Sequence, residues 1–235
     1  MWFVQVGNYD EHRMASRIGS LELVDGLNML HLLLPGSAVV YYGDELGMLD
    51  ATHGLHLSPS DARFLSRGPQ VSPMLWTNQA FAGFTNASHP PWLPINERYR
   101  LLNVQHQLKA PHSTLKVFQK LVHLRTAQGG LRSGTFQQVM AGQSVYAFVR
   151  TSRLNMAHGF LVILDLRKPG GQPEGTDSLR EYSLTSSGLN GWGTIVLHSV
   201  SFQRRFKQAD YNQTVDLRAT ISLRPSEALL IQFPV

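Results

Sequence analysis

An apolar run, Trp2-Phe3-Val4-Gln5-Val6, is followed directly by Gly7-Asn8-Tyr9-Asp10-Glu11-His12-Arg13. A short apolar run that ends at glycine and asparagine predicts a buried strand. Asp10 therefore follows the C-terminal end of that strand. Parallel α/β barrels keep their catalytic groups at this end of their strands. The stretch predicts a barrel strand that is followed by a functional carboxylate.

A second strand is predicted after an amphipathic helix. Apolar residues recur at spacings of three and four over residues 21–34, and Pro35-Gly36 ends this helical pattern. The run Ala38-Val39-Val40-Tyr41-Tyr42 is continuously apolar, as is typical of a strand in a parallel sheet. Gly43-Asp44-Glu45-Leu46-Gly47-Met48 follows it. Strand, helix and strand, with an acid after each strand, predict one repeat of a barrel with both acids at the same end.

These stretches resemble family 13 of the glycoside hydrolases, which includes α-amylases, maltases and α-glucosidases. In that family, Asn-His-Asp with Arg three residues further on follows the seventh strand, and this chain has Asn8-Tyr9-Asp10-Glu11-His12-Arg13. The sequence of residues 34–48, LPGSAVVYYGDELGM, is similar to the eighth strand and its loop. Residues 66–77 resemble a maltase segment, but polar positions of that segment carry other residues here, namely Gly68, Val71, Leu75 and Thr77.

The resemblance implies roles for residues of the first loop. Asp10 occupies the position of the acid that stabilises the transition state, and Tyr9 and Arg13 occupy substrate-binding positions. Tyr9 stands where the family has a histidine, and a phenol offers one hydroxyl in place of two ring nitrogens. Retaining glycosidases also need a nucleophile and an acid/base. The resemblance places these two acids before Met1, so whether the parent protein is an active enzyme stays open.

The residue pattern and the resemblance together divide the chain into two domains. Residues 1–131 are predicted to form the last strands and helices of a (β/α)8 TIM barrel, with a long loop over residues 50–112. From residue 134 the apolar period changes to two, which indicates strands. Residues 132–235 are therefore predicted to form an antiparallel β-sandwich domain. Strands are predicted near residues 144–149, 159–164, 194–197 and 228–233, with Val145, Phe148, Leu161 and Ile163 in the core.

Composition narrows the possible ligands and partners. The 235 residues include 21 Lys and Arg against 16 Asp and Glu, which gives a formal net charge of +5. The basic residues are scattered apart from Arg204-Arg205-Phe206-Lys207, so we expect no nucleic-acid partner. The absence of cysteine excludes disulfides and zinc–thiolate sites. The ten histidines are scattered and no nucleotide-binding glycine motif occurs, so we expect neither a metal nor a cofactor.

Two classes of function fit the resemblance. The first is part of an active retaining α-glucosidase (maltase), whose substrate would be an α-1,4-linked glucoside. The second is the ectodomain of a heavy subunit of a heteromeric amino-acid transporter. Such ectodomains are similar to family 13 but have eroded catalytic residues, and they pair with a membrane light subunit. The C-terminal Leu230-Ile231-Gln232-Phe233-Pro234 resembles one such subunit, and together with Tyr9 it favours the second class.

The location is predicted from weaker signals. The sequons Asn86-Ala87-Ser88 and Asn212-Gln213-Thr214 make Asn86 and Asn212 candidate glycosylation sites and favour the secretory pathway. The longest apolar stretch, residues 27–42, is broken by a histidine and by Pro-Gly, and its helical part is shorter than the ~20 residues that cross a bilayer. We therefore expect an extracellular or plasma-membrane ectodomain, with a signal or anchor before Met1.

Overall fold

The computed structural model describes residues 2–51, 68–142, 144–152, 158–170, 178–205 and 213–235. The chain forms two compact units. The sheet unit comprises Met1–Val4, Glu22–Ala38 and Val117–Val235, and the loop unit comprises Gln5–Leu21 and Val39–Lys116. The units are defined by contacts between residues in space, and their segments alternate along the sequence. The domain boundary expected between residues 131 and 132 stays a prediction.

The predicted order of strand, helix and strand is present in residues 1–48. β1 (Phe3–Gln5) and β2 (Ser37–Val39) are neighbours in a two-stranded sheet, and α1 (Met14–Ile18) and α2 (Val24–Leu33) lie between them in sequence. The first strand was predicted to be buried, and this is wrong, since Phe3 is 68% exposed. The reason is that β2 is the only strand beside β1 in the described part of the chain, so little covers it.

The two strands run in the same direction. At their beginning, the Ser37 amide donates a hydrogen bond to the Trp2 carbonyl over 2.8 Å. Beyond their ends, Gly7 lies so close to the Asp44 carboxylate that a β-carbon would not fit at Gly7. The segments that carry Asp10 and Asp44 therefore follow the same end of the two strands, as predicted.

The loop unit is built largely from irregular chain. Leu46, Met48, Leu75, Ala82 and Leu115 form its buried core. The side chain of Gln107 forms hydrogen bonds with the backbone of two irregular segments. It donates to the Leu46 carbonyl over 2.8 Å and accepts from the Leu115 amide over 2.8 Å. Among its described residues, the regular elements that lie wholly in this unit are α1, η1 (Asp44–Leu46), η3 (Ala80–Gly83), η4 (Glu97–Arg100) and α4 (Val104–Lys109).

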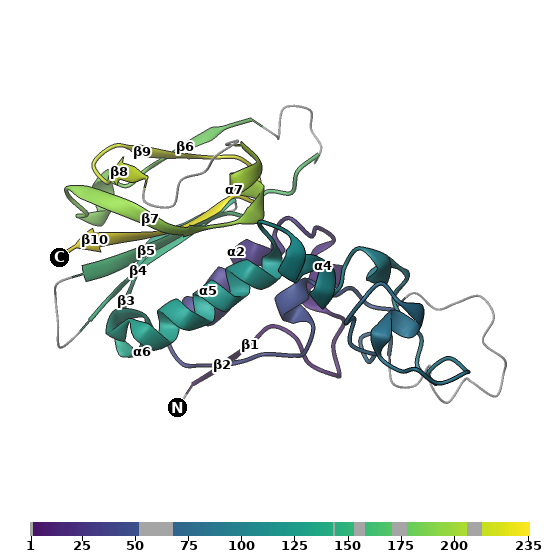
Figure 1. Ribbon diagram of the computed structural model, residues 1–235. Helices are drawn as coiled ribbons and strands as arrows, with labels where there is room; N and C mark the ends of the chain where they lie inside the picture. Colours follow the sequence, from purple (N-terminus) through teal and green to yellow (C-terminus); the bar gives the residue numbers. More distant parts are fainter. Residues whose placement is uncertain (1, 52–67, 143, 153–157, 171–177, 206–212) are drawn as a thin grey trace. The chain divides into compact units, whose positions relative to one another are not determined.

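The C-terminal half of the chain is an antiparallel β structure (Figure 1). Its larger sheet has the strand order β3-β4-β5-β10-β7-β8, and its smaller sheet pairs β6 with β9. The strands are β3 (Thr135–Ala141), β4 (Val145–Thr151), β5 (His158–Asp165), β6 (Arg180–Ser183), β7 (Trp192–His198), β8 (Thr214–Asp216), β9 (Thr220–Leu223) and β10 (Ala228–Pro234). A short 3-10 turn η5 (Thr185–Ser187) and the helix α7 (Val200–Arg205) complete it.

The four predicted strands are confirmed as β4, β5, β7 and β10, but β3, β6, β8 and β9 were missed. β3 is the outermost strand of the larger sheet, and its first four residues are all exposed. Its sequence, TFQQVMA, shows no alternation of apolar and polar residues, which is the signal that identifies a half-buried strand.

Both faces of the larger sheet are covered. On one face, Val145, Leu161 and Ile163 pack in a core with residues of β6 and β9. On the other face, α2 and α5 (Thr114–Ala127) lie along the sheet (Figure 1), and their leucines pack with Phe148. The four predicted core residues are all buried, but they belong to two separate cores. Because β5 is buried on both faces, it reads as a continuous apolar run.

Two arginines cap the C-terminal end of α2. Arg150 of β4 donates from Nη1 to the Leu33 carbonyl over 2.5 Å. Arg125 of α5 donates to the carbonyls of Leu32 and Gly36. The last carbonyls of a helix have no partner within the helix, so these donors satisfy groups that burial would otherwise isolate. Burial lowers the pKa of Arg150 to about 10, which leaves the side chain charged at neutral pH.

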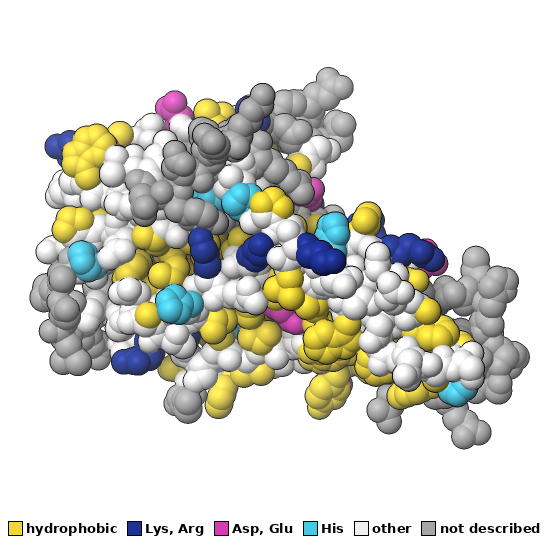
Figure 2. All heavy atoms as spheres, in the orientation of Figure 1, with side chains coloured by type: hydrophobic (Ala, Val, Ile, Leu, Met, Phe, Trp, Pro, Cys, Tyr) yellow, Lys and Arg dark blue, Asp and Glu magenta, His cyan; other side chains and the backbone are white. Residues whose placement is uncertain are grey.

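Large apolar side chains also reach the surface, where they lie among scattered basic side chains (Figure 2). Trp76, Phe84 and Trp92 of the loop unit and Trp192 of the sheet unit are each about half exposed. Single exposed apolar residues are common on folded proteins, so these side chains alone identify no binding site.

The helix α6 (Gly129–Ser133) joins α5 to β3.

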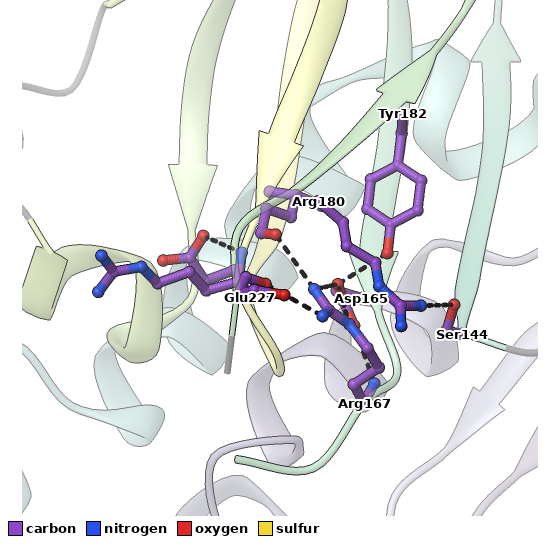
Figure 3. A network of polar contacts seen from close by, with 9 residues as sticks. Ser144, Asp165, Arg167, Arg180, Tyr182 and Glu227 are labelled. Carbon is purple, nitrogen blue, oxygen red and sulfur yellow. Dashed lines mark hydrogen bonds and ion pairs between the residues drawn. The ribbon is translucent and has the colours of Figure 1, made fainter. Parts of the chain in front are cut away.

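A buried ion pair lies at the end of β5 (Figure 3). Asp165 is 1% exposed and accepts from Arg167 Nη2 over 2.6 Å and from the Tyr182 hydroxyl over 2.8 Å. Arg167 also donates to the Ser178 carbonyl, and nearby Arg180 donates to the Ser144 hydroxyl. Burial, and then the hydrogen bond to Asp165, raises the pKa of Tyr182. The network connects β5 with β6 and is structural, because its members contact one another.

We expect unequal losses of stability when this network is shortened. Tyr182→Phe removes one hydrogen bond to a buried charge and should lower the free energy of unfolding by roughly 1.5–3 kcal/mol. Asp165→Ala leaves the buried Arg167 charge without the carboxylate it pairs with and should lower it by roughly 3–5 kcal/mol. Urea unfolding of the full chain, followed by circular dichroism, measures both. Asp216→Ala, which removes the exposed pair with Arg218, is the control and should change little; equal effects of all three substitutions would contradict the assignment.

Candidate functional site

The loop after β1 presents Asp10 to solvent in a defined shape. The Asn8 side chain accepts hydrogen bonds from the amides of Asp10, over 2.8 Å, and of Glu11, over 2.9 Å. This is an Asx-type turn, in which a side-chain oxygen replaces a backbone acceptor. Tyr9 is 67% exposed, and its carbonyl accepts from the Gln70 side chain over 2.6 Å. Asn8 and Gln70 therefore fix the backbone while Tyr9 and Asp10 remain at the surface.

Arg13 lies beneath this surface. Its side chain is completely buried, and its guanidinium carbon is 4.9 Å from the ring centre of Tyr41 and 4.8 Å from that of Tyr42. It also donates from Nη1 to the Tyr42 carbonyl over 2.7 Å. Cation–π contacts with aromatic rings partly replace the hydration that a buried guanidinium loses. Burial raises the pKa of Tyr41 to about 12, so its phenol is neutral at physiological pH.

Asp44 is a second carboxyl group behind the loop. It is 2% exposed and lies against Gly7. Burial raises its pKa to about 6, although the nearby charges of Arg13 and Arg17 act in the opposite direction. Glu45 adds to the increase and accepts a hydrogen bond from the Gly43 amide over 2.7 Å. Asp44 and Glu45 therefore shape the backbone behind the first loop, and Asp44 changes its charge near pH 6.

Asp50 connects the first loop to the rest of the loop unit, and no sequence motif pointed to this residue. Its carboxylate accepts from His12 Nδ1 over 2.6 Å and from the Arg13 amide over 2.8 Å. Its amide donates to the Ser16 hydroxyl over 2.8 Å, and its carbonyl accepts from the Asn96 side chain over 2.5 Å. One residue therefore holds the loop, the start of α1 and a distant segment together.

The predicted site residues differ in their exposure to solvent. Tyr9 and Asp10 share one exposed loop, whereas Arg13 is buried below it, and the roles of all three in binding stay predictions. Asn86 is exposed, and Asn212 lies outside the described residues. Within the described ranges, no group of three or more possible metal ligands occurs, and no helix has the length and apolar character that a membrane crossing requires.

The burial of Asp44 predicts a pH-dependent stability. Because its pKa is raised from 3.8 to about 6, the folded chain loses stability as the pH rises through this range and the carboxyl group ionises. The difference corresponds to roughly 3 kcal/mol. Asp44→Asn removes this titration, so the stability of the variant relative to the unmodified chain should rise between pH 4 and pH 7. Urea unfolding at several pH values measures it, and a difference that is independent of pH would contradict the prediction.

Comparisons with known proteins agree with this architecture. Residues 1–134 match the family Alpha-amylase, described as "Alpha amylase, catalytic domain". Maltase 1 of Drosophila virilis is 37% identical over 158 residues, which cover 63% of this chain and 24% of that protein. The amino acid transporter heavy chain SLC3A1 of Mus musculus is 31% identical over 228 residues, which cover 96% of this chain and 30% of that protein. The chain therefore spans about a quarter to a third of the length of these relatives.

A solved structure is similar over nearly the whole chain. The trehalose-6-phosphate hydrolase of Bacillus licheniformis aligns with a TM-score of 0.76 at 20% identity, covering 99% of this chain and 43% of that one. At this identity the likeness concerns the fold, and it confirms the predicted part of a barrel followed by an antiparallel β domain. Together with the family match over residues 1–134, which are more than half of the sequence, this establishes that the chain belongs to the α-amylase family, glycoside hydrolase family 13.

Proposed function

We propose that the chain is the C-terminal part of an α-glucosidase-like protein that has lost catalysis and acts as the ectodomain of an amino-acid transporter heavy subunit. One observation carries the proposal. The similarity to mouse SLC3A1 extends over 96% of this chain, whereas the similarity to Maltase 1 of Drosophila virilis covers 63%. The C-terminal β domain is thus included in the alignment with the transporter subunit.

The first loop supports the same proposal. Tyr9 replaces the histidine of the family pattern, and its exposed phenol is bulkier and has a single polar atom. We assign Tyr9 and Asp10 to the surface of a former sugar site, in which Asp10 keeps the position of the transition-state stabiliser. Arg13 would contribute from below, through its contacts with Tyr41 and Tyr42. A single exposed acid in this position cannot supply both the nucleophile and the acid/base that retention requires.

An active enzyme is the alternative. The identity to Maltase 1 is 37%, higher than the 31% to mouse SLC3A1, although over fewer residues. Asp10 also remains exposed on a loop that Asn8 holds in shape. In this alternative the parent is a retaining α-glucosidase whose substrate is an α-1,4-linked glucoside. Its two principal acids would come from sequence outside this chain.

The proposal also assigns a partner and a location. The partner would be a transporter light subunit in the membrane, and the ectodomain would lie outside the cell. Asn86 is exposed in a sequon, as a glycan acceptor must be. No cofactor is required by either proposed function.

Co-purification tests the proposed partner. We expect the full-length parent, tagged and extracted from cell membranes in a mild detergent, to enrich an amino-acid transporter light subunit that mass spectrometry identifies. A tagged Maltase 1 of Drosophila virilis, expressed in the same cells, serves as the control and should not enrich it. Equal recovery of light subunits with both baits would argue against the transporter role.

A chromogenic α-glucoside separates the two proposed functions. We expect the full-length parent and its Tyr9→His variant to show no turnover above background, because the chemistry needs two correctly placed carboxyl groups. If the parent instead turns over at about 1–1000 per second, as typical enzymes do, and Asp10→Asn lowers kcat by several orders of magnitude, the parent is an active glucosidase.

A further inference from the structure

His12 is the most exposed member of the hydrogen-bond network around Asp50. Its side chain is 63% exposed, whereas that of Asp50 is 15% exposed. The ring atom Nδ1 lies 2.6 Å from Asp50 Oδ2, and Asp50 is the only partner of this ring within the described part of the chain. A carboxylate can only accept hydrogen bonds, so Nδ1 must carry the proton. In the neutral ring, Nε2 is then an acceptor.

The orientation of this ring is fixed from behind. The other carboxylate oxygen of Asp50 accepts from the Arg13 amide over 2.8 Å. The backbone of Asp50 is held at both polar groups, by Ser16 over 2.8 Å and by Asn96 over 2.5 Å. The Asp50 carboxylate therefore cannot turn away from His12 without also losing the hydrogen bond from the Arg13 amide. An exposed imidazole that a carboxylate orients in this way keeps one tautomer and one direction, as in catalytic histidines with a carboxylate partner.

His12 and Asp10 belong to the same short loop, and both are exposed. The turn made by Asn8 limits the conformations of the backbone between them. Two acceptors, a carboxylate and an imidazole nitrogen, are thus carried by one short loop. The hydroxyl groups of a polyhydroxylated ligand can donate to acceptors of both kinds, whereas an anion would be repelled by Asp10.

We infer that His12 is a ligand-contacting residue of the Asp10 loop, which accepts a hydrogen bond from a hydroxyl of a polyhydroxylated neutral or cationic ligand, and that Asp50 is its positioning residue. The inference rests on the proposed assignment of Asp10 to a former sugar site. It depends neither on catalysis nor on the transporter partner. His12 thereby supplies a hydrogen-bond acceptor three residues from Tyr9, which replaces the histidine of the family pattern.

Calorimetric titration of the full-length parent with maltose and with 1-deoxynojirimycin tests the inference. His12→Phe keeps a ring of similar size and removes both nitrogens. Since one hydrogen bond to the ligand is lost, we expect binding of the probes to weaken roughly three- to ten-fold. His89→Phe is the matched control, because His89 is an exposed histidine of the same unit outside this network, and it should leave binding unchanged.

Asp50→Asn tests the positioning role. The amide oxygen can still accept from the Arg13 backbone, but the negative charge that selects the His12 tautomer is gone. We expect binding to weaken about as much as in His12→Phe, and the double variant to be no weaker than His12→Phe alone. Thermal unfolding of each variant shows whether the chain remains folded at the temperature of the titration.

Several outcomes would overturn the inference. One is that His12→Phe binds both probes as tightly as the unmodified parent. Another is that Asp50→Asn weakens binding equally whether or not His12 is present, since Asp50 would then act independently of the imidazole. A third is that the folded parent binds neither probe at millimolar concentration. Co-purification with a light subunit would be unaffected in each case, so failure here remains separate from failure of the proposed function.

Discussion

The carbonyl groups at the end of α2 need hydrogen-bond donors, and the organisation of the sheet unit depends on how this need is met. Arg125 and Arg150 supply the donors from residues 89 to 117 positions away in sequence. Because buried acceptors without partners are costly, the barrel helix is fastened to the helix and the strand that carry these arginines. The same helix also covers the apolar face of β5 and β10. This is why a helix from the N-terminal part of the chain belongs to one compact unit with the β domain.

The sequence predicted those features that depend on local apolar patterns. The leucine-rich period of α2 and the continuous run of β5 were sufficient, since each reports directly which faces are buried. Burial of Arg13, the links made by Asp50 and the packing role of Gln107 could not be predicted. These depend on contacts between distant segments, and nothing in the local sequence distinguishes them from ordinary surface polar residues. The motif after β1 pointed to the exposed loop of Tyr9 and Asp10, whose role stays a prediction, but not to the buried residues that hold this loop.

In the loop after β1, the residues that hold the backbone differ from those that present side chains to solvent. Its shape comes from Asn8, Gln70 and Asp50, which bond to its backbone, whereas Tyr9 and Asp10 contribute side chains at the surface. Substitution at an exposed position can therefore change what the loop binds without changing its backbone. This explains how both a maltase and a transporter subunit can be similar to this chain. The backbone of such a loop can persist while its exposed side chains change.

The outermost strand of the larger sheet has a consequence for handling the protein. β3 contains no charged residue and no proline over its seven residues, and only a register shift between Gln138 and Met140 interrupts its pairing. The opposite edge, β8, has three residues and ends at Asp216, which forms an ion pair with Arg218. Uncharged edges are templates for strand pairing between molecules, especially while a chain is incompletely folded. Refolding yield should therefore fall as chain concentration rises, and aggregation through this edge, rather than unfolding, would limit the shelf life of concentrated samples.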